Sequence, residues 1–130
     1  MREEPIAKIT LDENITIQLW DKSRILAGDR YYICLEARAE IPYSLEDLDG
    51  MADKEKAYRV LREVYGEKIP YVYVQERHFI DKGAKEDIMK GFLENFYKNK
   101  LPYLRNPHFR KRSIQAKVRE LRQKRPQLFL

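Results

Sequence analysis

This sequence has few of the residues with which proteins build disulfides, metal sites and phosphate loops. It has one cysteine and two histidines, and its five glycines are scattered at positions 28, 50, 66, 83 and 91. A single cysteine cannot form an internal disulfide, and His78 and His108 lie far apart with no cysteine near either, which excludes the familiar zinc-site spacings. The scattered glycines form no Gly-rich phosphate loop. We therefore expect no metal and no cofactor.

Long apolar runs are also lacking. No stretch approaches the roughly 18–20 apolar residues of a membrane span, and the opening segment MREEPIAKIT has no apolar run after its charges, as a secretory signal would. The composition, 43% hydrophobic and 36% charged, is that of a globular protein. We expect a cytoplasmic protein without membrane contact, in which Cys34 is a reduced, buried or half-buried apolar residue.

Acidic residues are almost missing from the C-terminal quarter. Residues 98–130 hold eleven of the 26 lysines and arginines but only one of the 21 acidic residues, Glu120. The net charge is therefore +10 in this segment and −5 in residues 1–97, although the whole chain carries +5. Such a split favours a polyanionic partner or a tail that packs on an acidic surface.

The first forty residues alternate as β-strands do. Two short strands at 7–11 and 15–19 are joined by the polar turn Asp12-Glu13-Asn14. A hairpin with this turn places three apolar pairs on one face: Leu11 with Ile15, Ile9 with Ile17, and Ala7 with Leu19. A longer strand at 30–41 alternates apolar and polar residues until Pro42 ends it.

The remaining residues change period. Helices are predicted from Ser44 to about Tyr65, with a break at Gly50 and an end at Gly66, from about 85 to 98, and from Asn106-Pro107 to Arg125. The β-branched and aromatic run that starts at 71 reads as a fourth strand toward 80. The order predicts an α+β fold with an antiparallel or mixed four-stranded sheet and helices covering one face. We treat 1–105 as the core and 106–130 as a basic helix and tail of the same single domain.

The segment WDKSRILAGDRYY, residues 20–32, joins two predicted strands and is dense in polar groups. A structural interpretation is available: a bulge at Asp21-Lys22 extends the strand, and 27–29 make the reversal. The alternative is an anion site, which requires two arginine side chains to face solvent together. The candidate residues of this loop site are Ser23, Arg24, Asp29 and Arg30.

An enzyme is the weaker alternative. Its site would lie between segment 20–32 and His78, with Glu76 on the same face of the strand to hold the imidazole. The sequence has no GxSxG elbow, and its paired carboxylates stand at predicted helix starts, where negative charge suits the helix dipole. We assign no catalytic residue.

The predicted C-terminal helix has two faces. Ile114, Val118 and Leu121 form a narrow apolar seam, while Arg112, Arg119 and Arg122 share another side. Such a cationic stripe suffices for phosphate contacts. The candidate residues for binding nucleic acid, a nucleotide or another polyanion are Arg110, Lys111, Arg112, Lys117, Arg119, Arg122, Lys124 and Arg125.

These features together favour binding over catalysis. The preferred hypothesis is a small non-enzymatic interaction module that docks a protein partner, or a second copy of itself, through the sheet edge and the C-terminal helix. Nucleic acid is the alternative partner.

Overall fold

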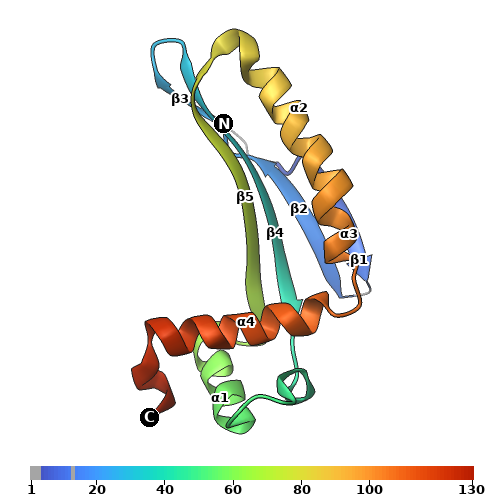
Figure 1. Ribbon diagram of the computed structural model, residues 1–130, viewed down its shortest axis with the longest axis vertical. Coiled ribbons are helices and arrows are strands. Elements are labelled where there is room, and N and C mark those ends of the chain that lie inside the picture. The colour runs from blue at the N-terminus through green and yellow to red at the C-terminus, as the bar shows by residue number, and fades with distance from the viewer. Residues whose placement is uncertain (1–3, 13) are drawn as a thin grey trace. The chain divides into compact units, whose positions relative to one another are not determined.

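The computed structural model describes residues 4–12 and 14–130 (Figure 1). The chain forms two compact units, each made of two stretches of sequence. Unit 1 comprises residues 1–39 and 72–105, and unit 2 comprises residues 40–71 and 106–130. The division expected after residue 105 coincides with one of the points where the chain passes between the units. That the whole chain is one domain stays a prediction.

Five antiparallel strands form one sheet in the described part of the chain. Their bounds are β1 (Ala7–Asp12), β2 (Ile15–Asp21), β3 (Arg24–Ala27), β4 (Arg30–Pro42) and β5 (Lys68–Asp81). The central strand is β4: β2 and β3 pair with successive parts of one of its edges, β1 pairs with β2, and β5 pairs with β4 (Figure 1). β4 and β5 each begin in one unit and end in the other.

The first hairpin has most of the predicted register. Ile9 lies opposite Ile17 and Ala7 opposite Leu19, as expected. The third predicted pair is wrong, because Asp12, not Leu11, lies opposite Ile15 across a bulge. The Asp12 carboxylate accepts the amides of Asn14 and Ile15 at 2.8 and 3.1 Å, so the turn is tightened around this side chain. Glu13, part of the predicted turn, lies outside the described residues.

The α+β fold with an antiparallel sheet is confirmed. The sheet has five strands instead of four because the strand that follows the first turn is interrupted at Lys22 and Ser23 and resumes as β3. The alternation of β4 holds from Leu35 to Ile41, and the buried side chains of one face include Ile33, Leu35 and Ala37, while Cys34 of the other face is buried too. We call the face that carries Ile33, Leu35 and Ala37 the inner face of the sheet.

The helices of unit 1 lie on this inner face. They run without a gap from α2 (Lys85–Asn95) through a π-helical turn (Phe96–Lys100) into α3 (Leu101–Leu104). The side-chain amide of Gln75 in β5 donates to the backbone carbonyl of Phe92 in α2 at 3.0 Å, and the Lys100 ammonium lies 4.5 Å from the ring centre of Tyr73. No side chain of α2 is fully buried.

Unit 2 contains two longer helices, α1 (Lys54–Tyr65) and α4 (Phe109–Lys124). A short 3₁₀ helix (Leu45–Leu48), called the 3₁₀ helix below, precedes α1, and a second one (Pro126–Phe129) follows α4. The predicted break in the first helix is confirmed, since Gly50 has φ +91° and separates the 3₁₀ helix from α1. Gly66, with φ +80°, ends α1 as predicted. The apolar seam of α4 is buried: Ile114 and Val118 are fully enclosed and Leu121 nearly so.

Candidate functional site

The predicted loop segment 20–32 is mostly sheet. At the break between β2 and β3, the Asp21 carboxylate accepts the amide of Ser23 at 2.9 Å, and the Ser23 hydroxyl accepts the amide of Cys34 at 3.0 Å. The amide of Lys22 donates to the carbonyl of Cys34 at 3.0 Å. These bonds continue the pairing with β4 across the break between β2 and β3, so the polar residues at the break hold both strands onto β4.

The two arginines of this segment have separate contacts. Arg30 forms ion pairs with Asp81 of β5 and, at 3.9 Å, with Asp29. The Arg24 guanidinium lies 5.1 Å from the ring centre of Tyr32. The structure thus holds each arginine by a different partner and does not bring the two side chains into a shared contact.

The residues of the hypothetical enzyme site have structural contacts of their own. The Tyr32 hydroxyl donates to the Glu76 carboxylate, and the His78 ring lies 4.9 Å from the Tyr32 ring. Hydrogen bonds with Cys34 and Glu76 raise the pKa of Tyr32. Glu76, expected to orient His78, is therefore bonded to Tyr32. The catalytic hypothesis gains no positioned acid–base pair from these contacts.

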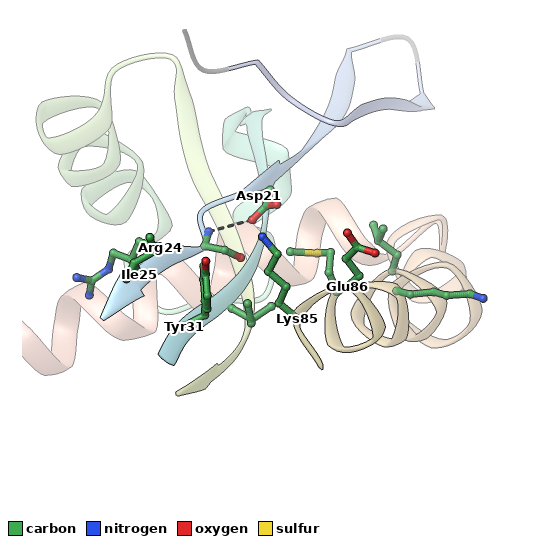
Figure 2. Close-up of a pocket in the computed structure, with 11 residues that line it drawn as sticks. Asp21, Arg24, Ile25, Tyr31, Lys85 and Glu86 are labelled. Carbon is green, nitrogen blue, oxygen red and sulfur yellow. Dashed lines mark hydrogen bonds between the residues drawn. The ribbon is translucent and has the colours of Figure 1, made fainter. Parts of the chain in front are cut away.

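A pocket of about 800 Å³ lies in unit 1 between α2 and the strands β3 and β4 (Figure 2). Its walls come from the end of β2, from β3, from the start of β4 and from the first turns of α2. The lining residues are Asp21, Ser23, Arg24, Ile25, Tyr31, Ile33, Lys85, Glu86, Met89, Lys90 and Leu93. Two of the predicted loop-site residues, Ser23 and Arg24, thus line this pocket, whereas Asp29 and Arg30 are not among its lining residues.

Sequence reasoning missed the α2 side of this pocket. Met89 and Leu93 belong to the apolar stripe of the predicted helix, where they read as core residues. In the structure both are only partly buried. No feature of the sequence separates an apolar residue that fills a core from one that lines an open pocket.

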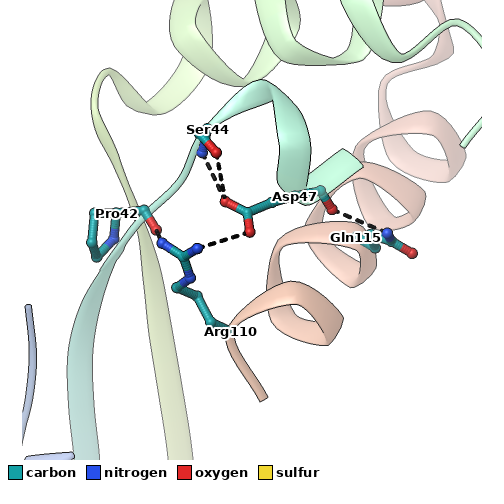
Figure 3. Close-up of polar contacts among 5 residues, drawn as sticks. All are labelled: Pro42, Ser44, Asp47, Arg110 and Gln115. Carbon is teal, nitrogen blue, oxygen red and sulfur yellow. Dashed lines mark hydrogen bonds and ion pairs between the residues drawn. The ribbon is translucent and has the colours of Figure 1, made fainter. Parts of the chain in front are cut away.

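In unit 2, Arg110 of the predicted polyanion site is engaged in a polar network (Figure 3). Its guanidinium donates to the Asp47 carboxylate at 3.0 Å and to the carbonyl of Pro42 at 3.5 Å. The same carboxylate accepts the amide of Ser44 at 2.8 Å, and the Gln115 side chain donates to the carbonyl of Asp47 at 3.0 Å. This network ties α4 to the 3₁₀ helix.

Three further candidates on α4 are held by neighbours in unit 2. Lys117 and Lys124 both pair with Glu120, at 3.2 and 3.1 Å, and their hydrogen bonds lower the pKa of that carboxyl. The Arg122 guanidinium donates to the carbonyl of Ala52 at 2.6 Å. No described carboxylate pairs with the other four candidates, which are Lys111, Arg112, Arg119 and Arg125.

A second open feature of unit 1 is the edge of β5. One edge of β5 faces β4, and no described strand pairs with the other. Val72 and Val74, which alternate with the half-buried Tyr73, have 54% and 40% of their surface exposed. Both valines lie on the outer face of the sheet, opposite the face covered by α2.

The described residues contain neither a cluster of metal-ligating side chains nor a helix suited to span a membrane. No three His, Cys, Asp or Glu side chains in residues 4–12 and 14–130 come together as ligands would. None of the described helices combines the length and apolar character needed to cross a bilayer. Comparison of the chain with protein-family models, curated proteins and solved structures gives no match.

Proposed function

We propose that this protein is a non-enzymatic interaction module that associates with a second copy of itself through the free edge of β5. The proposal rests on that edge, which extends over residues 72–81 of unit 1 with no described strand beside it. A free edge presents unpaired N–H and C=O groups, and an added strand satisfies them. An antiparallel pair of identical edges does so for both copies at once under two-fold symmetry.

The side chains near the edge also support association by strand addition. Val72 and Val74 are β-branched and suited to cross-strand packing, yet about half of each remains in contact with solvent. Phe79, further along β5, is 71% exposed. Strand addition would cover such side chains against their counterparts and add apolar burial to the backbone hydrogen bonds. The proposal assumes a reducing, cytoplasmic setting, which the free, buried thiol of Cys34 supports.

Analytical sedimentation over a range of protein concentrations tests this proposal. We expect the wild type to associate and the double variant Val72→Lys/Val74→Lys to require at least about tenfold more protein, because two lysines at the edge lose the apolar contact and repel their counterparts. Ile6→Lys is the matched control, since Ile6 is 49% exposed but precedes β1, which two strands separate from β5. The proposal is rejected if the wild type is monomeric at all concentrations, or if the wild type and the Val72→Lys/Val74→Lys variant associate equally.

A second candidate function is polyanion binding through α4. It is favoured by the four cationic side chains, Lys111, Arg112, Arg119 and Arg125, that pair with no described carboxylate. If all four contact phosphates, the logarithm of the binding constant should fall with the logarithm of salt concentration with a slope of about −3 to −4. Replacing Arg112 and Arg119 by Glu should remove the binding, and replacing the exposed Arg62 and Lys68 by Glu should not. A salt-independent signal would reject this function.

A further inference from the structure

The pocket of unit 1 has the size and the walls of a small-molecule site. At about 800 Å³ it lies within the usual range for such sites, roughly 300–1,000 Å³. The sheet contributes Ile25, Tyr31 and Ile33, and α2 contributes Met89 and Leu93, so both walls are largely apolar. The partial exposure of the α2 residues means that an apolar ligand can displace water from them.

Three cations line this pocket: Arg24, Lys85 and Lys90. Lys85 is half-buried, and its ammonium lies 4.9 Å from the ring centre of Tyr31. No described carboxylate lies within ion-pair distance of it. A half-buried lysine without a described counter-ion favours a ligand that supplies a negative charge. Figure 2 shows the Lys85 side chain rising beside Tyr31, with its ammonium on the side of Asp21.

The other charged groups of the lining are engaged or solvated. Asp21 accepts the amide of Ser23, and Glu86 lies in the first turn of α2, where its charge complements the helix dipole. Both acids are exposed, so water screens their repulsion of an anion. The Arg24 guanidinium points away from Lys85 in Figure 2 and lies over Tyr32. Lys90 is exposed, as is Arg24, so Lys85 is the half-buried cation among the three.

We propose that this pocket binds an amphipathic carboxylate, with its apolar tail between β4 and α2 and its carboxylate on Lys85. The tail would contact Ile33, Met89 and Leu93, and the carboxylate would replace the water around the Lys85 ammonium. This site lies on the inner face of the sheet and is independent of the proposed association through β5.

The methionine methyl groups allow a direct test by NMR. In protein labelled with ¹³C at the methionine methyls, Met89 reports on the pocket and Met51, in unit 2, is an internal control. A Met89→Leu variant assigns the signal. Titration with decanoate should shift the Met89 resonance and leave that of Met51 in place. Decan-1-ol should bind about five- to tenfold more weakly and decyltrimethylammonium more weakly still, because only decanoate satisfies the lysine charge.

Chain length and substitution separate the two halves of the site. Shortening decanoate to octanoate should weaken binding by up to about fifteenfold, as expected for two buried methylenes. Lys85→Gln should bring the affinity for decanoate down to that for decan-1-ol, whereas Lys98→Gln, at an exposed position outside the pocket, should change neither. An unmoved Met89 signal with all three probes, or alcohol or ammonium binding as tight as that of decanoate, overturns the proposal.

Discussion

Helix α4 of unit 2 differs from α2 and β5 of unit 1 in how completely its side chains are buried or paired within the unit. In unit 2, α4 buries four apolar residues, and its Arg110 donates to the carboxylate of Asp47, itself only 7% exposed. In unit 1, α2 buries no side chain fully, Lys85 lines a pocket without a described counter-ion, and no described strand pairs with one edge of β5. Within its unit, α4 is therefore packed and hydrogen-bonded, whereas α2 and β5 leave apolar and polar groups open to solvent, and both proposals concern these open groups.

The largest expected effect is on stability, through the apolar seam of α4. Ile114→Ala removes a fully buried side chain and should lower the free energy of unfolding by about 2–4 kcal/mol. Ile88→Ala, at a half-buried position of α2, should cost about 1 kcal/mol, because the site already borders water. Urea denaturation measures both. Equal losses would remove the contrast between the two helices.

Thiol reactivity distinguishes closed from open positions within unit 1. Cys34 is 4% exposed, and burial raises the pKa of its thiol. We expect its reaction with a disulfide reagent to be at least about 100-fold slower than that of a free thiol, because it requires local opening. Val72→Cys in a Cys34→Ala background should react rapidly in dilute protein and more slowly as association proceeds. Fast reaction of native Cys34 would show that the sheet centre is open.

The Asp47 network should contribute a smaller amount. Asp47→Ala leaves the amide of Ser44 and the guanidinium of Arg110 without their shared acceptor, and should cost about 1–3 kcal/mol in thermal or urea unfolding. Asp49→Ala, at an exposed carboxylate that pairs with Lys54, is the control and should change stability little. If the two variants are equally stable, the network does not anchor α4.

The smallest effect concerns pH. Hydrogen bonds from Lys124 and Lys117 lower the pKa of Glu120, so its contribution is present above the unfolded-state pKa and is lost as pH falls through the lower folded-state value. Because Glu120 is exposed to 41%, the contribution should stay below about 1 kcal/mol. Unfolding of the wild type and Glu120→Gln should differ at neutral pH and converge in acid. A difference that grows on acidification contradicts the assignment.

Alternation and turn chemistry were sufficient to predict much of the fold. The period of β4, the pairing of Ile9 with Ile17, the interruption after Asp21 and the seam of α4 all follow from neighbouring residues. The bulge opposite Ile15 was missed because it depends on which amides one aspartate side chain accepts.

The sites were less predictable because they depend on distant residues. Arg110 and Asp47 are far apart in the sequence, so the sequence does not predict the network that engages Arg110 of the candidate polyanion site. The pocket brings Tyr31 of β4 against Lys85 of α2, and periodicity shows only that each belongs to an amphipathic element. Packing between elements decides which apolar stripe is buried in a core and which lines an open pocket.

Amide hydrogen exchange of β5 at low and high protein concentration tests the proposed association most directly. In residues 72–81, the amides that point away from β4 should exchange quickly in dilute protein and gain protection as the protein associates. The amides bonded to β4, and those of α4, should show no such dependence on concentration. Protection confined to α4, or exchange in β5 that is independent of concentration while the protein associates, would contradict association through this edge.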